Sequence, residues 1–147
     1  MEFKGGRQML KTTELFINEL EEHELTYEPV RVLEDGDEMV QLGAKLDNTF
    51  VQLIIFFDAD EDAVAIRCFD LVRVSEEQYP KALMSCNALN DRMRWVKFCI
   101  DKERNVQAEV DAVIDDTNAG KVTMNLVLRM ASIIDDAYPV INKAIWS

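Results

Sequence analysis

An acidic loop near the middle of the chain holds the first residues whose spacing could support chemistry. Asp58, Asp60 and Asp62 are spaced like the first three oxygen ligands of an EF-hand calcium loop. That loop also needs glycine at its sixth position and glutamate at its twelfth, where this chain has Ala63 and Phe69. The match fails, so the sequence predicts a solvated turn between two strands and no metal site.

Groups that could catalyse acid–base or nucleophilic reactions are scarce. His23 is the only histidine, and it lies among glutamates without a partner that would make it a general base. Asp115-Asp116 and Asp135-Asp136 are adjacent acids, but the first pair suits a helix N-terminus and the second a solvated break before a proline. The chain has five glycines, no G-x-S-x-G sequence and no glycine-rich phosphate loop. We therefore predict no catalytic residue, no cofactor-binding residue and no enzyme.

The three cysteines also suggest no reaction. Cys68, Cys86 and Cys99 are odd in number, widely spaced and without a C-x-x-C pair. This pattern indicates neither a disulfide framework nor a zinc site. Their neighbours are mostly apolar, which favours buried, inert thiols over a reactive cysteine.

Basic residues gather in one stretch of an otherwise acidic chain, within thirteen residues. They are Arg92, Arg94, Lys97, Lys102 and Arg104. One interpretation is charge balance against acids of a neighbouring strand. The other is a protein-contact surface with Trp95 as its aromatic anchor, because Trp and Arg dominate interface energetics.

Charge and hydropathy limit the partners and the location. The chain has 147 residues and a net charge of −12, which disfavours binding to nucleic acid or anionic lipid. No apolar run approaches the roughly 20 residues that span a bilayer, and the N-terminus lacks the apolar core of a signal peptide. We therefore predict a cytoplasmic protein with no nucleic-acid or membrane partner.

Periodicity predicts the elements that must position these residues. The expected order is a helix from Thr12 or Thr13, strands over 27–33, 39–46, 50–57 and 63–74, a helix ending near Arg92, strands over 95–101 and 106–112, and a helix from near Thr117. Strands that follow one another without helices between them pair antiparallel. The predicted class is α+β, with helices packed on an antiparallel sheet. Residues 1–11 are expected to form a mobile leader and 12–147 a single domain.

Several local signals refine these elements. Thr12 or Thr13 is expected to cap the first helix, and Glu19 to face water along with its acidic neighbours. Gly36 suits a tight turn that requires positive φ, and Ser75 with Gln78 forms a capping-box pattern. Pro139 is expected to kink or interrupt the last helix and to leave a backbone carbonyl near residue 135 without its partner.

The third strand is apolar on both faces, with Phe50, Ile54 and Phe56 on one of them. Such a strand is expected to be buried on both sides. The second cover is either a helix of the same chain or another copy of the protein, so Phe50 and Phe56 join the candidate contact residues.

The stretch N-A-L-N-D-R-M-R-W-V-K-F-C-I-D over 87–101 resembles the YbjN-type family of bacterial proteins, described as putative sensory transduction regulators. That family typically shows an N-x-x-N segment at a helix end, here Asn87 and Asn90, and then a strand of the kind W-V-K-F-x-I-D. The resemblance covers most of the chain from Thr12 onward. It implies a fold similar to class I type III secretion chaperones, which are small acidic homodimers that bind extended segments of other proteins. It supplies no catalytic residue.

Two functional hypotheses follow. The leading one is a non-enzymatic protein-binding module, chaperone-like or regulatory, that acts as a homodimer in the bacterial cytosol. The alternative is a small-ligand-binding protein or enzyme with an acidic pocket between helices and sheet, using acids such as Asp135 and Asp136.

Overall fold

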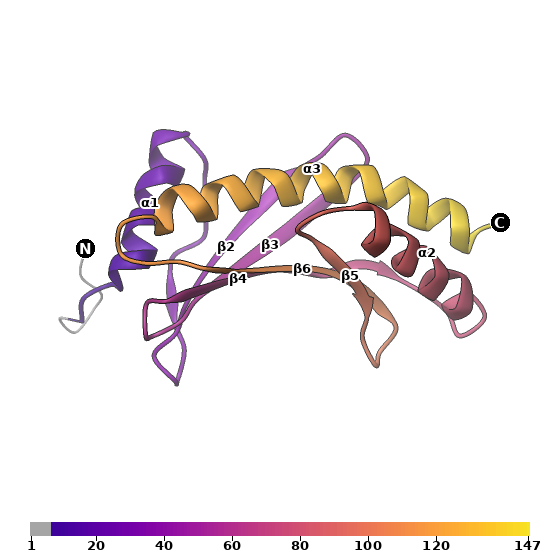
Figure 1. The fold of residues 1–147 in the computed structure, drawn as a ribbon, viewed down its shortest axis with the longest axis horizontal. Coiled ribbons are helices and arrows are strands. Elements are labelled where there is room, and N and C mark those ends of the chain that lie inside the picture. The colour runs from indigo at the N-terminus through magenta and orange to yellow at the C-terminus, as the bar shows by residue number, and fades with distance from the viewer. Residues whose placement is uncertain (1–6) are drawn as a thin grey trace. The chain divides into compact units, whose positions relative to one another are not determined.

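The computed structural model describes residues 7–147, so the first six residues of the expected leader lie outside the described part of the chain. The elements are α1 (Lys11–Glu22), β1 (Arg31–Val32), β2 (Glu38–Lys45), β3 (Phe50–Phe57), β4 (Ala63–Arg73), α2 (Tyr79–Arg92), β5 (Lys97–Ile100), β6 (Asn105–Val113) and α3 (Ala119–Ile145). Figure 1 shows them in this order along the chain. The predicted α+β class and the order of helices and strands are confirmed.

The six strands form one sheet in the order β1-β2-β3-β4-β6-β5. The pairs at its two edges, β1 with β2 and β5 with β6, are both antiparallel. The predicted edge position of the first strand is correct, although only two of the seven expected residues are in strand conformation. Pro29 has no N–H to donate, which explains why regular pairing does not begin before Arg31.

The chain divides into two compact units. Unit 1 comprises Met1–Leu42, Ile54–Ile66 and Asp111–Val127, and unit 2 comprises Gly43–Leu53, Arg67–Val110 and Leu128–Ser147.

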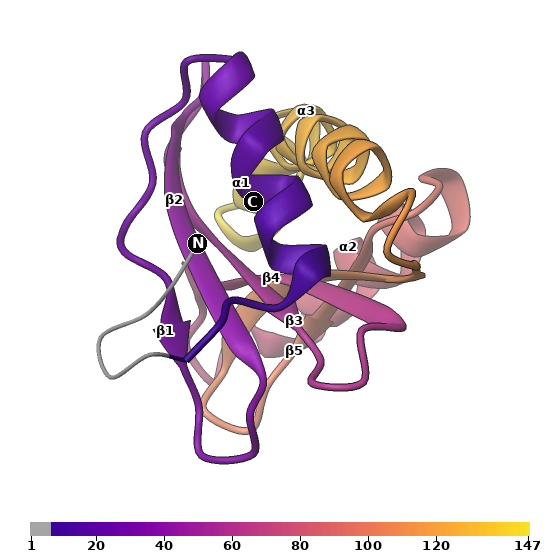
Figure 2. The ribbon, with the colours of Figure 1, turned by 90° about the vertical axis from the view of Figure 1, so that its left-hand side faces the viewer.

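In unit 1, α1 packs on the strands through the predicted stripe. Phe16, Ile17 and Leu20 are fully buried, and the ring of Phe16 lies 5.6 Å from that of Phe57. Figure 2 shows α1 beside the start of α3. The two helices approach closely because residue 120 is glycine: a Cβ there would lie 2.7 Å from the Leu15 carbonyl oxygen.

The prediction that Glu19 faces water is wrong. Glu19 is buried, and its carboxylate lies 2.7 Å from Nζ of Lys121 on α3. The stripe of α1 that contacts other elements is therefore wider than the apolar residues alone indicated, because α3 covers part of its polar side.

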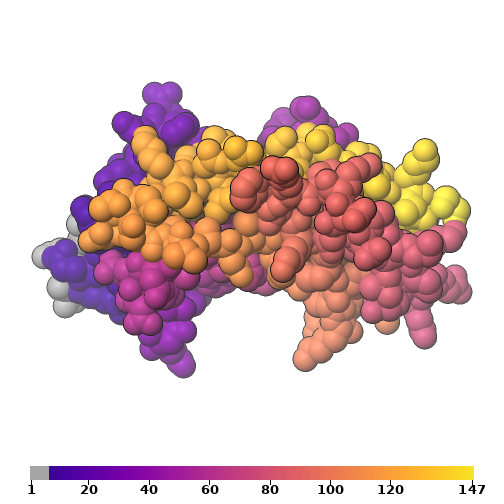
Figure 3. All heavy atoms as spheres, viewed as in Figure 1, coloured from indigo at the N-terminus to yellow at the C-terminus, as the bar shows by residue number. Residues whose placement is uncertain are grey.

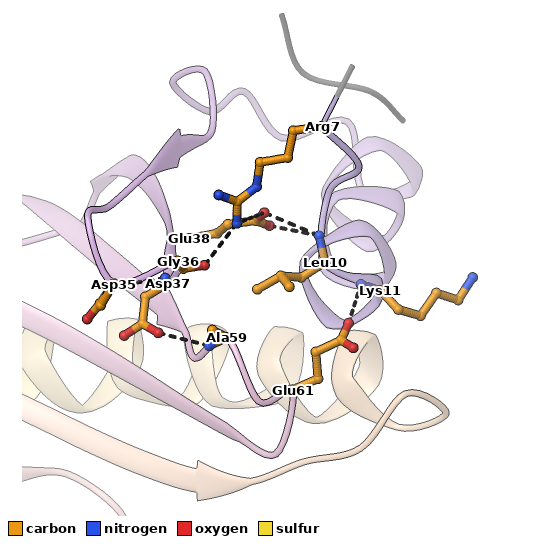
Figure 4. Close-up of polar contacts among 9 residues, drawn as sticks. All are labelled: Arg7, Leu10, Lys11, Asp35, Gly36, Asp37, Glu38, Ala59 and Glu61. Atoms are coloured by element: carbon orange, nitrogen blue, oxygen red, sulfur yellow. Dashed lines mark hydrogen bonds and ion pairs between the residues drawn. The ribbon is translucent and has the colours of Figure 1, made fainter. Parts of the chain in front are cut away.

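The predicted cap of α1 is also wrong. The helix begins at Lys11, Leu10 is its N-cap without a side-chain bond, and the hydroxyls of Thr12 and Thr13 are buried without a hydrogen-bond partner. Two distant carboxylates accept the first N–H groups instead. Glu38 accepts from Leu10 at 3.1 and 3.2 Å, and Glu61 accepts from Lys11 (Figure 4).

Figure 4 also shows how this end of unit 1 is tied together. Arg7 donates to the Gly36 carbonyl at 3.1 Å, and its guanidinium lies 3.8 Å from the fully buried Glu38. Asp37 accepts the Ala59 N–H at 2.8 Å, which links two turns. Gly36 has φ of 92°, so the predicted glycine turn is confirmed.

In unit 2, α2 lies on β5. The side-chain amide of Asn90 accepts the Phe98 N–H at 2.7 Å and donates to the Phe98 carbonyl at 2.9 Å. Asn90 thus occupies backbone groups of an edge strand that could otherwise pair with another chain. The predicted capping box is confirmed one turn before the helix. The Ser75 N–H donates to the Gln78 side-chain oxygen at 2.9 Å, and the Gln78 N–H donates to the Ser75 hydroxyl oxygen at 3.2 Å.

The last helix is not interrupted at Pro139: α3 runs through it as one helix of 27 residues. Met130, Ile134 and Ile141 of its second half are fully buried.

A candidate protein-contact surface

Trp95 lies on the connection between α2 and β5, just outside the strand that was expected to include it. Its φ is 73°, and 55% of its surface is exposed. Positive φ is a genuine outlier for a bulky side chain, costs on the order of 1–3 kcal/mol, and persists only where neighbouring structure enforces it. Here the end of α2 and the start of β5 enforce it, since Asn90 holds both together through Phe98.

The indole of Trp95 has a cationic neighbour. The guanidinium carbon of Arg129, on α3, lies 5.6 Å from the centre of the ring, within the range of a cation–π interaction. Sequence reasoning missed Arg129 because it lies far from Trp95 along the chain and no motif connects them. Leu128, which precedes it, is also exposed. We call Trp95 and Arg129, with the exposed Arg92, Arg94 and Lys97, the Trp95 surface.

The basic cluster of the sequence is only partly on this surface. Arg92, Arg94 and Lys97 are exposed, and Lys97 lies opposite Glu109 in the antiparallel register, so charge balance also operates there. Arg104 instead donates to the Val74 carbonyl at 3.2 Å and has φ of 64°. Arg104 therefore fixes the β5–β6 turn to the segment that follows β4.

Phe50 lies elsewhere in unit 2. Its strand, β3, is separated from β5 by β4 and β6 in the sheet order, which is about 14 Å at ordinary strand spacing. A Cβ on Gly43 would lie 2.7 Å from the Phe50 ring, so this ring covers the glycine of the neighbouring strand. Phe50 nevertheless remains 59% exposed, and its role as a contact residue stays a prediction.

Phe56 belongs to unit 1 and is half-buried. The expectation that β3 is buried on both faces is therefore wrong for the single chain. Val51, Leu53, Ile55 and Phe57 are buried, whereas the alternate positions range from half-buried to exposed. The contact role of Phe56 also stays a prediction.

Three of the acids considered as site residues, Asp135, Asp115 and Asp58, have structural partners. The Asp135 carboxylate accepts the backbone N–H groups of Asp47 at 3.3 Å and Asn48 at 2.8 Å. Asp115 accepts from the Thr117 hydroxyl at 2.7 Å and from backbone N–H groups ahead of α3, and these bonds hold its pKa below the ordinary value. Asp58 likewise accepts from the backbone of Asp62 and Ala63 in its own turn.

Two of the cavities of the described residues lie in unit 2. The first, of about 470 Å³, lies between the start of α2 and the end of α3 and is lined by Ser75, Glu77, Gln78, Lys81, Ile145, Trp146 and Ser147. The second, of about 320 Å³, is lined by Glu76, Tyr79, Asp101, Lys102 and Arg104. Neither contains Asp135 or Asp136.

The thiols are protonated at neutral pH. Burial raises the pKa of Cys68 and of Cys86 to about 11, and burial also raises the pKa of Cys99. Within residues 7–147, no group of three or more His, Cys, Asp and Glu side chains is arranged to hold a metal ion. No helix in the same range is long and apolar enough to cross a membrane.

A family model named YbjN and described as "Putative bacterial sensory transduction regulator" matches residues 13–142. The chain belongs to the YbjN family. The match extends over parts of both compact units. A comparison with curated proteins finds no match.

Two solved structures are similar to the chain. One is the crystal structure of YbjN from E. coli, described as "a putative transcription regulator", with 11% identity, a TM-score of 0.54 and coverage of 85% of this chain and 90% of that one. At this identity the likeness shows a shared fold. The other is the HopA1-SchA chaperone-effector complex, with 14% identity, a TM-score of 0.46 and coverage of 86% and 94%. A likeness at that TM-score supports no conclusion about function.

Proposed function

We propose that this chain is a non-enzymatic protein-binding module of regulatory or chaperone-like type, which acts as a homodimer in the bacterial cytosol. Residues 12–147 serve as one functional domain in this proposal. The observation that carries it is Trp95, a large aromatic side chain kept exposed at positive φ and stacked by Arg129.

An exposed tryptophan at positive φ is costly for the folded chain by itself. A tryptophan that is half in water gains less from burial than a core residue, and its backbone conformation adds strain. A partner that covers the ring removes its remaining apolar surface from water. Tryptophan and arginine are also the residue types most enriched among interface hot spots.

The charges around Trp95 indicate the kind of segment that would bind. Arg129 lies over the Trp95 ring, and the exposed Arg92, Arg94 and Lys97 lie within three residues of Trp95 along a chain whose net charge is −12. Complementary charge increases the association rate and selects the partner. The expected ligand is therefore a protein segment with an apolar side chain flanked by acidic ones.

The cytosolic location is supported by the cysteines. All three are free, and two of them are buried with raised pKa values. Secreted proteins of this size more often pair their cysteines in disulfides.

The chain offers a matched test because it has two exposed tryptophans. Trp95→Ala and Trp146→Ala remove the same side chain from different places, and Trp146 is 77% exposed. Proteins retained by the wild type would be purified and titrated against the wild type and both variants. We expect Trp95→Ala to weaken binding at least tenfold and Trp146→Ala to leave it within twofold. Equal affinity of both variants would refute the Trp95 surface.

A further inference from the structure

In unit 1, the face of the sheet that points away from α1 carries apolar side chains. The ring of Phe16 on α1 contacts that of Phe57, so the buried residues of β3, β4 and β6 mark the face that the helix covers. Side chains alternate between the two faces of a strand, which places the residues between them on the opposite face. In unit 1 the apolar ones are Ile54, Phe56, Ala63, Ala65 and Val113, and we call them the Val113 surface.

Val113 keeps 86% of its surface in water, and the other four residues are half-buried. The N–H of the next residue, Ile114, donates to the Asp62 carbonyl at 3.1 Å and brings this end of β6 beside the start of β4. Figure 3 shows the atoms of this end of β6 next to those of the β3–β4 turn. Val113 therefore lies beside the alanines of β4.

β3 joins the same surface from the other side of β4. The Asp58 N–H donates to the Ala63 carbonyl at 3.4 Å across the β3–β4 turn. Two residues further along this antiparallel pair, Phe56 lies next to Ala65. The Val113 surface thus runs over three neighbouring strands, β3, β4 and β6. A continuous exposed apolar surface is typical of a contact with another protein.

The strands beneath this surface indicate the shape of the partner. β3 and β4 lie between β2 and β6 in the sheet, so their backbone groups pair with neighbouring strands. A partner therefore reaches this face through side chains and not by adding a strand. Three strands at ordinary spacing span about 10 Å, which is the width of an α-helix. A helix already covers the opposite face in the same way.

The charges around the Val113 surface indicate the chemistry of that helix. Residues 54–66 and 111–120 contain acids but no lysine, arginine or histidine. The acids are Asp58, Asp60, Glu61, Asp62, Asp111, Asp115 and Asp116. Some of these like charges lie close together, since the hydrogen bond with Asp58 and the negative charge of that neighbour raise the pKa of Asp62. Complementary charge selects the partner, so basic side chains are expected beside its apolar face.

We propose that the Val113 surface binds an amphipathic helix of another protein, whose apolar face lies across β3, β4 and β6 and whose flanking side chains are lysine or arginine. The inference goes beyond the proposed function. It adds a second binding surface in the other compact unit, and this surface takes a partner of opposite charge to that expected at the Trp95 surface.

A synthetic helix tests the surface. The probe is a fluorescently labelled peptide of leucine and lysine, about five turns long, with its leucines on one side. We expect the wild type to bind it and Val113→Arg to bind it at least tenfold more weakly. Val140→Arg is the matched control, because it adds the same charge to an exposed valine of α3. It should bind within twofold of the wild type, and circular dichroism should show that both variants are folded.

Two further peptides test the chemistry of the partner. A leucine–glutamate helix of the same pattern should bind at least tenfold more weakly, and so should a leucine–lysine peptide whose leucines are spread around the helix. Asp60→Asn combined with Asp62→Asn should weaken binding of the lysine helix about threefold. Glu76→Gln combined with Glu77→Gln removes two exposed acids of unit 2 and should leave binding unchanged.

The contrary outcomes would each overturn the inference. Equal weakening by Val113→Arg and Val140→Arg would mean that net charge alone attracts the peptide. Equal binding of the three peptides would mean that the surface does not select a basic amphipathic helix, and no binding by the wild type would mean that it is not a docking site. Trp95→Ala should bind the lysine helix within twofold of the wild type, so failure of this surface is distinguishable from failure of the Trp95 surface.

Discussion

Asn48 and Asp135 bind each other through both backbone and side chain. The Asn48 N–H donates to the Asp135 carboxylate at 2.8 Å, and the Asn48 side-chain amide donates to the Asp135 carbonyl at 3.0 Å. That carbonyl lacks its normal helical partner because the residue four positions later is Pro139, which has no N–H. The β2–β3 turn therefore supplies the donor that the proline removes.

This pair predicts which of two adjacent acids matters for stability. Asn48→Ala and Asp135→Ala should each lower the free energy of unfolding by about 1–2 kcal/mol, because each leaves hydrogen-bonding groups without a partner. Asp136→Ala is the control, since Asp136 is exposed, and should change it by less than about 0.5 kcal/mol. Urea unfolding measures all three. Equal effects of Asp135→Ala and Asp136→Ala would contradict the role of the turn.

Glu38 should be the most sensitive acid of unit 1. It is fully buried, accepts the Leu10 N–H and lies beside Arg7. Glu38→Ala should destabilise the protein by about 2–3 kcal/mol, because it removes a helix cap and leaves its donors without an acceptor. Asp60→Ala, at an exposed position of the same unit, should have little effect in the same thermal or urea unfolding experiment.

Thr123 offers a stabilising substitution. Its hydroxyl is buried without a hydrogen-bond partner. Thr123→Val replaces that hydroxyl with a methyl group of similar volume and should raise the free energy of unfolding by about 1 kcal/mol. Thr117→Val makes the same replacement where the hydroxyl donates to Asp115, and it should lower stability instead. Loss of stability in Thr123→Val would indicate that the hydroxyl has a partner in solution.

Two substitutions of Trp95 isolate its backbone strain. Alanine and glycine both remove the indole, but only glycine adopts positive φ without steric cost. Trp95→Gly should therefore be more stable than Trp95→Ala by about 1 kcal/mol, although glycine ordinarily destabilises a folded chain. If Trp95→Ala is the more stable of the two, φ at this position is not positive in solution.

The β5–β6 turn should respond to acid through Asp101. The backbone N–H of Asn105 donates to its carboxylate, and this bond together with that from Glu103 holds the pKa of Asp101 below its ordinary value. A lowered folded-state pKa means that the contribution to stability is present above the unfolded pKa and is lost as pH falls through the folded one. Stability measured from pH 6 to 2 should fall less steeply in Asp101→Asn than in the wild type. Identical slopes would remove Asp101 as a source of acid sensitivity.

Sequence periodicity was enough to predict the order of helices and strands, because burying one face of an element imposes a regular spacing of apolar residues along it. The bounds of β3 were predicted to the residue and the end of α2 was predicted near Arg92, where it lies, since apolar spacing and a polar boundary mark both. The reciprocal Ser75–Gln78 bonds and the glycine turn at Gly36 were also readable, because each depends on residues within four positions. The N-x-x-N segment and the strand after it indicated the YbjN family for the same reason.

Contacts between distant residues were decided only by the tertiary structure. Local sequence pointed to Thr12 or Thr13 as the cap of α1, but Glu38 at the start of β2 and Glu61 in the β3–β4 turn supply the caps from far away along the chain. Glu19 was assigned to water because its partner, Lys121, is on another helix. Arg129 lies over Trp95 only because α3 passes the α2–β5 connection. The local pattern of residues specifies which face of an element is apolar. Packing decides which polar groups of different elements meet, and the candidate contact surface depends on that packing.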